Sequence, residues 1–161
     1  ASSYNNIPLD RVHFLDLPFY ETGKIQKNPI SEADVEIVRN LLREIKPHQI
    51  FVAGDLADPH GTHRVCTDAV FAAVDLEKEE GAKWLKDCRI WMYRGAWAEW
   101  EIENIEMAVP ISPEELRAKR NSNPEASVAD GKRSVLKVMT NVCSGNVVKT
   151  VTVAQQRCTI S

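Results

Sequence analysis

The sequence predicts an α/β fold, in which strands alternate with helices around a mostly parallel sheet. Short, nearly continuous apolar segments at 49–54 and 89–93 contain β-branched and aromatic residues, which is typical of strands buried on both faces. The segments at 31–47 and 62–74 instead repeat apolar residues at helical spacing. Because this alternation continues over residues 12–120, a layered fold with parallel strands is expected.

The segment 12–20 is predicted to open as a strand, because it is rich in aromatic and aliphatic residues, and Pro18 closes this strand. Ser31 then has the character of a helix N-cap, and Asp34 three residues later complements the free amides of the first turn. Pro47 ends this helix. Its apolar positions recur at helical spacing: Val35, Val38, Leu41, Leu42 and Ile45.

After the strand at 49–54, a second helix is predicted from Thr62 to about Val74. Its buried face consists of Val65, Ala69, Ala72 and Ala73. Residues 89–93 form the third predicted strand, and residues 106–109 a possible fourth.

A third helix is predicted from Pro113 to about Arg120. Ser112 caps it and Glu115 completes a capping box, while proline suits the first helical position.

Composition narrows the class of protein. The 161 residues fit one domain, and with 43% apolar and 27% charged residues they match an ordinary globular protein. No apolar run approaches the roughly 18 residues that cross a bilayer. A net charge of -3 has the wrong sign for a generic nucleic-acid binder. The four cysteines form no C-x-x-C pair, and no signal peptide precedes the first strand, so a cytoplasmic location is expected.

The chain divides into two segments of different character near residue 120. Residues 121–161 carry five basic and two acidic residues, so the remaining 15 basic and 21 acidic residues make residues 1–120 acidic. All 11 aromatic residues also lie before position 121. In the basic tail, the segments 135–139 and 147–153 are predicted strands that could form a hairpin around 144–146.

Candidate chemistry is concentrated at 55–63, which holds two carboxylates and two of the four histidines. The segment follows a buried strand and leads into a helix, the place where open α/β sheets bind ligands. His60 and His63 can converge on a zinc ion, and Asp58 can orient one ring. Alternatively, this is a solvated loop in which Asp58 and Thr62 cap the helix. A catalytic zinc normally takes three protein ligands, and a full set is not evident.

The other candidate functional residues can also be interpreted as purely structural. Four aromatic residues are grouped after the third strand, where they can line a sugar-binding surface or simply pack: Trp91, Tyr93, Trp97 and Trp100. Arg94 can bind an anion such as phosphate or form a surface ion pair. His13 and His48 are expected to be structural.

The run from Asp58 to Arg64 resembles the second motif of the LmbE/PIG-L-like N-acetylglucosaminyl deacetylases, a His-x-x-His element after a buried strand. Residues 12–120 are similar to the branch found as the C-terminal region of glucosamine-6-phosphate deaminase-like fusion proteins, with Met107-Ala108-Val109-Pro110-Ile111-Ser112 as a further match. The resemblance implies a Rossmann-like fold and a zinc-dependent hydrolase of N-acetyl amino sugars. It makes His63 a zinc ligand and places His60 and Asp58 in the catalytic set.

The sequence departs from this family in two places. The family's His-Pro-Asp-Asp-Glu motif, which supplies two more zinc ligands and the base, is absent. The N-terminal part of the domain is therefore expected to be missing, and the chain alone to be inactive. The 121–161 tail also differs from the family's ending. Two alternatives are an accessory region of a glucosamine-6-phosphate deaminase/isomerase-like protein and a metal-independent sugar-binding module. In each case the expected partner is a small amino sugar.

Overall fold

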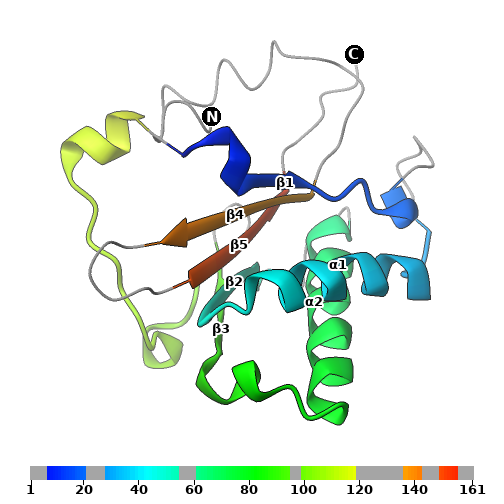
Figure 1. Cartoon of the computed structure of the whole chain (residues 1–161). Coiled ribbons are helices and arrows are strands. Elements are labelled where there is room, and N and C mark those ends of the chain that lie inside the picture. Colours follow the sequence, from blue (N-terminus) through cyan, green and yellow to red (C-terminus); the bar gives the residue numbers. More distant parts are fainter. Residues whose placement is uncertain are drawn as a thin grey trace, which may run out of the picture.

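The computed structural model describes residues 7–20, 28–54, 61–94, 99–118, 136–142 and 149–155. Within them, two α-helices pack against a five-stranded sheet with the order β1-β4-β5-β2-β3 (Figure 1). The helices are α1 (Glu32–Ile45) and α2 (Thr62–Glu79). The strands are β1 (Val12–Phe14), β2 (Gln49–Ala53), β3 (Arg89–Tyr93), β4 (Leu136–Val142) and β5 (Lys149–Gln155).

Four of the five strands run in one direction. β2 pairs in parallel with both β3 and β5, and β4 pairs antiparallel with both β5 and β1. Only β4 therefore opposes the others. The parallel strands β2 and β3 are joined through α2, as a parallel connection requires. The expected α/β class with a mostly parallel sheet is confirmed.

The start and end of α1 follow from local sequence. The Ser31 side chain accepts a hydrogen bond from the Asp34 amide, and the Asp34 carboxylate accepts one from the Ser31 amide at 2.8 Å. At the other end Lys46 adopts a left-handed conformation with φ 49°, and its amide binds the Leu42 carbonyl at 2.8 Å. Pro47 disfavours helical geometry at the preceding residue. The predicted cap and stop are confirmed.

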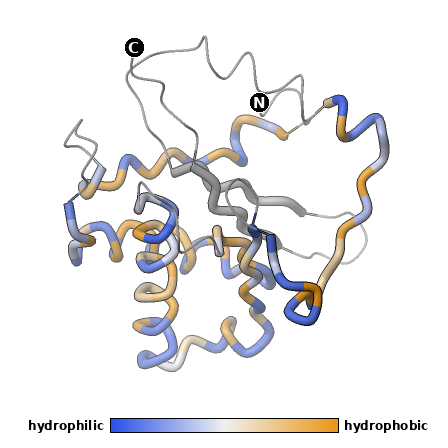
Figure 2. Tube along the Cα trace, turned by 180° about the vertical axis from the view of Figure 1, so that it is seen from behind, coloured by the Kyte–Doolittle hydropathy of each residue, from blue (hydrophilic) through white to orange (hydrophobic). Residues whose placement is uncertain are grey.

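The core lies between the two helices and one face of β2. Ile50 and Val52 alternate with more exposed neighbours and have no exposed surface. Since alternate residues of a strand share a face, both helices cover the same side of the sheet. The helices contribute Val38, Leu41, Leu42, Cys66, Ala69, Val70 and Ala73 to this core. Hydrophobic and hydrophilic residues accordingly alternate along the helices in Figure 2.

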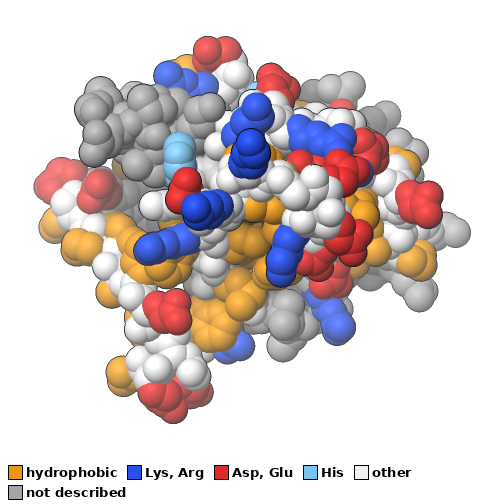
Figure 3. Space-filling view, turned by 60° about the horizontal axis from the view of Figure 1, so that its bottom comes forward, with side chains coloured by type: hydrophobic (Ala, Val, Ile, Leu, Met, Phe, Trp, Pro, Cys, Tyr) orange, Lys and Arg blue, Asp and Glu red, His pale blue; other side chains and the backbone are white. Residues whose placement is uncertain are grey.

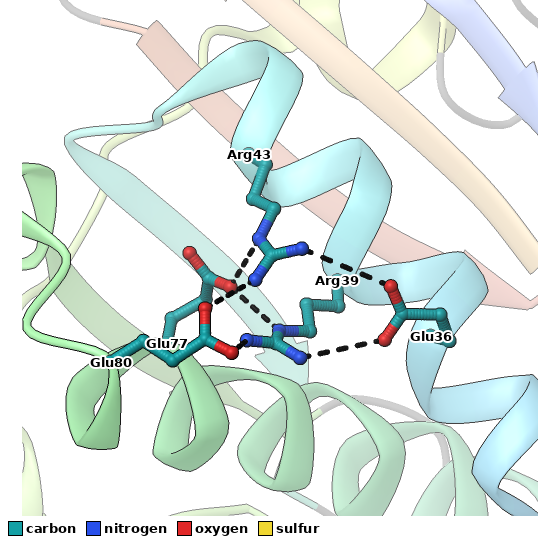
Figure 4. Close-up of polar contacts among 5 residues, drawn as sticks. All are labelled: Glu36, Arg39, Arg43, Glu77 and Glu80. Carbon is teal, nitrogen blue, oxygen red and sulfur yellow. Dashed lines mark hydrogen bonds and ion pairs between the residues drawn. The ribbon is translucent and has the colours of Figure 1, made fainter.

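A network of ion pairs joins α1 to α2 beside this core (Figure 4). Oε1 of Glu77 accepts hydrogen bonds from Nε of Arg39 at 2.7 Å and from Nε of Arg43 at 2.6 Å. Glu80 pairs with both arginines, and Glu36 approaches them from α1 itself. The hydrogen bonds to Glu80 and Glu77 raise the pKa of Arg39, so it stays charged. Elsewhere on the surface, basic and acidic side chains lie beside exposed hydrophobic ones (Figure 3).

Three predicted elements differ from those observed. The strand predicted to close at Pro18 already ends at Phe14, because the backbone turns at Asp16 with φ 44°, and a 3-10 helix (Pro18–Tyr20) follows. The strand predicted over 106–109 is wrong: these residues are exposed and not in a ladder. The helix predicted to end near Val74 continues to Glu79, just before Gly81 with φ 72°.

The later predictions agree with the structure where it describes them. Residues 113–118 are helical, and Ser112 and Glu115 exchange the two hydrogen bonds of a capping box at 2.6 and 3.2 Å. The strands β4 and β5 form the predicted antiparallel pair, although the turn at 144–146 lies outside the described residues. The division into a partial deacetylase-like domain over 1–120 and a tail over 121–161 that differs from the family stays a prediction. In the described part of the chain, no helix has both the length and the apolar character to cross a membrane.

Candidate functional site

The carboxyl ends of β2 and β3 meet the first turns of α2, and this is where the sequence places its candidate chemistry. The Thr67 hydroxyl donates to the Ala53 carbonyl at 2.8 Å, which fixes α2 to the end of β2. The Gly54 amide donates to the Tyr93 carbonyl at 2.7 Å, which holds the two strand ends together. This edge of an open α/β sheet is the usual position of a ligand site.

Among the predicted site residues, His63 is the one that the structure describes. It lies in the first turn of α2 and is half-buried. Asp58 and His60 fall outside the described residues, so their catalytic roles stay predictions. The capping role considered for Thr62 is wrong, because Gly61 occupies the N-cap with φ 68° and Thr62 is the first helical residue. The left-handed N-cap suits glycine, which has no β-carbon.

A zinc ion needs more donors than the described residues bring together. Within those ranges, no three His, Cys, Asp or Glu side chains are grouped closely enough to hold a metal. Since a catalytic zinc takes three protein ligands, His63 alone does not make such a site. The described part of the chain therefore does not fit zinc by itself.

An arginine and a tryptophan are stacked at the end of β3. Cζ of Arg94 lies 4.0 Å from the centroid of the Trp100 ring, within the range of a cation–π contact. Nη1 of Arg94 donates to the Glu99 carbonyl at 3.1 Å, and the Trp100 indole donates to the Met92 carbonyl at 3.1 Å. The sequence analysis treated the four aromatic residues of this region alike and did not single out Trp100. The aromatic ring that stacks on Arg94 is set by how the chain folds back after β3, which the sequence pattern does not reveal.

The other predicted residues have more ordinary places. Trp91 is half-buried and Tyr93 lies at the exposed end of β3, while Trp97 lies outside the described residues. His13 is a half-buried residue of β1. The His48 carbonyl accepts the Arg89 amide at 2.9 Å, at the amino ends of β2 and β3 and hence away from the candidate site.

Two ionisable groups near these strands are held in their neutral forms. Partial burial of the Tyr93 side chain, and secondarily the electrostatic repulsion from Cys66, raise the pKa of Tyr93. Burial raises the pKa of Cys88 from 9.0 to about 11. Neither group is an anionic nucleophile near neutral pH.

Gly54 leaves the room into which Trp100 packs. A β-carbon on Gly54 would lie 2.8 Å from Cβ of Met92 and 2.8 Å from Cζ2 of Trp100. Gly54→Ala is expected to displace the indole and lower stability by about 1–3 kcal/mol, as overpacking does. The thermal midpoint and the tryptophan near-UV circular dichroism would report both changes. Gly54→Ala combined with Trp100→Ala should recover part of the loss, because the ring is one of the two clashing groups.

In comparisons with known proteins, no protein-family model matches this chain, and no solved structure matches it significantly.

Proposed function

We propose that this chain contributes to a Rossmann-like, zinc-dependent amidohydrolase domain that removes acetyl groups from N-acetylglucosamine-type amino sugars in the cytoplasm. The observation that carries the proposal is the position of His63. It lies in the first turn of α2, the helix that follows the parallel strand β2 and is bound to the carboxyl end of that strand through Thr67. This is where the resemblance to the LmbE/PIG-L-like deacetylases requires a zinc-binding histidine.

The described residues supply parts of such a site. The half-buried imidazole of His63 is a suitable zinc donor, and the indole of Trp100 lies at the end of β3, where it donates to the Met92 carbonyl. The remaining zinc ligands have to come from outside the described residues. His60 has the spacing to converge with His63, and the resemblance assigns two more ligands to the His-Pro-Asp-Asp-Glu motif that the sequence lacks. The proposal therefore includes that the chain is inactive or very weak by itself.

Metal binding and hydrolysis test this proposal separately. After equilibration with zinc and removal of the excess, His63→Ala is expected to retain about tenfold less zinc than the unaltered chain. His13→Ala removes an imidazole from β1 and serves as the control. Equal zinc retention in the His63 variant would contradict the assigned ligand. Stoichiometric zinc together with acetate release from N-acetylglucosamine by this chain alone would contradict its inactivity.

The stacking of Arg94 on Trp100 favours a second candidate, a sugar-binding module that needs no metal. Aromatic faces and charged hydrogen-bond donors at one strand end can bind a sugar directly. Under this alternative, glucosamine binding measured by calorimetry persists in a chelator and in His63→Ala, but is lost in Trp100→Ala. Loss of binding in the chelator would instead favour the metal-dependent proposal.

A further inference from the structure

Arg94 has hydrogen-bond donors that the described part of the chain does not use. Its Nη1 binds the Glu99 carbonyl and one face of its guanidinium covers the Trp100 ring. Its Nε is buried and has no acceptor. Two other buried polar atoms within the described ranges also lack a hydrogen bond, Nη2 of Arg39 and Nε1 of Trp91. However, Nη2 of Arg39 has an ion pair with Glu80, and the indole is neutral.

The charge of Arg94 is also not neutralised by the described residues. Arg39 and Arg43 share the carboxylates of Glu77 and Glu80, Arg64 faces Asp68, and Arg117 faces Glu114. No carboxylate of the described ranges lies within ion-pair distance of Arg94, so the surface ion pair considered from the sequence is not observed there.

We propose that Arg94 binds an oxyanion, a phosphate or carboxylate group of a small ligand, at the carboxyl end of β3. The Nε and Nη2 edge of a guanidinium presents two parallel N–H donors, which match two oxygens of either group. Because Nη1 is engaged by Glu99 and one face is covered by Trp100, this edge has a fixed orientation. A ligand oxygen would also satisfy the buried Nε, whose lack of an acceptor is costly.

The position agrees with the general placement of ligands in this class of fold. Arg94 directly follows β3, and the end of β3 is hydrogen-bonded to the end of β2 through Gly54. Ligand groups bind beyond the carboxyl ends of such parallel strands. The site requires neither zinc nor amide hydrolysis, so this proposal can be tested independently of the proposed function.

The test follows the Nε–H signals of arginine by nitrogen-15 NMR in the full chain without metal. Inorganic phosphate and acetate are titrated separately at constant ionic strength, and Arg94→Lys assigns the Arg94 signal by its loss. We expect a saturable shift at Arg94 with one or both anions, and smaller, unsaturated shifts at the exposed Arg64 and Arg117. Saturation with phosphate only identifies a phosphate site, and saturation with acetate only identifies a carboxylate site.

Two lysine variants distinguish binding by the two parallel N–H donors of Arg94 from binding by its positive charge alone. Arg94→Lys keeps the charge but loses the two-donor edge, so phosphate or acetate binding, measured at backbone amides near the strand ends, should weaken about tenfold. Arg64→Lys should leave binding unchanged, because Arg64 is exposed and paired with Asp68. Equal unsaturated shifts at all three arginines, or unchanged binding in Arg94→Lys, would overturn the proposal.

Discussion

Asp34→Ala is expected to lower the free energy of unfolding by about 3 kcal/mol, because three donors lose their acceptor. The Asp34 carboxylate is fully buried. One oxygen accepts the Phe19 amide at 2.9 Å, and the other accepts the amide and hydroxyl of Ser31 at 2.8 and 2.5 Å. The Phe19 residue is itself buried, so water cannot readily replace the lost acceptor.

Urea unfolding followed by circular dichroism measures this loss as a lower midpoint at an unchanged slope. Asp68→Ala is the matched control: Asp68 is exposed on α2, and its oxygen lies 3.9 Å from Arg64, so its removal should change stability by less than about 1 kcal/mol. Similar losses in the two variants would show that Asp34 acts only as a surface charge near a helix end.

Glu77→Ala is expected to lower the free energy of unfolding by about 3 kcal/mol as well, for a different reason. The Glu77 side chain is 4% exposed and is hydrogen-bonded to both Arg39 and Arg43. Removing one member of a buried ion pair leaves the opposite charge without compensation, which costs more than the pair contributed. Glu80 and Glu36 still face the arginines and limit the loss.

The same unfolding measurement tests the network, with Glu114→Ala as its control. Glu114 pairs with Arg117 on an exposed helix, and such pairs contribute about 0–1 kcal/mol. Glu77→Gln keeps the acceptor oxygen without the charge, so its effect should lie between those of the two alanine variants. A Glu77→Ala protein as stable as Glu114→Ala would contradict the structural role of the network.

Local sequence was sufficient to predict the elements whose stability is local. Ser31 and Asp34 mark the start of α1, and Ser112 and Glu115 mark the start of the helical turn at 113–118. Capping bonds join residues three apart, so they can be recognised without knowing the rest of the fold. The strands β2 and β3 were predicted at their observed positions from their continuous apolar runs, but the expected burial on both faces is wrong. Only alternate residues of β2 are buried, and β3 lies at the edge of the sheet with no buried residue.

The strand predicted at 106–109, which is not observed, shows that local sequence alone does not predict every strand. Three apolar residues follow Glu106 in this segment, yet it has no ladder partner. The Tyr93 carbonyl points toward β2, so the preceding Met92 carbonyl points to the free edge of β3. There it is bound by the Trp100 indole. A strand needs a partner with free donors and acceptors, which periodicity alone does not provide.

Some features of the candidate site could likewise be predicted from the sequence, and others could not. The position of His63 after a buried strand could be predicted, because it follows from the order of elements. The stacking of Arg94 on Trp100 and the room beside Gly54 could not, because they depend on side chains that meet across the end of the sheet. The extension of α2 to Glu79 was missed similarly. Apolar periodicity fades there, while Glu77 is buried against arginines of another helix.

The sequence by itself determined the α/β class, the helix starts, and the two tail strands that pair as β4 and β5. These features depend on periodicity, capping and β-propensity within short stretches of chain. Tertiary structure decided that β5 lies between β4 and β2, that Asp34 also binds Phe19, and that Arg94 keeps a donor without an acceptor. Each of these depends on contacts between residues distant in the sequence or on the geometry of one side chain, which no local pattern encodes.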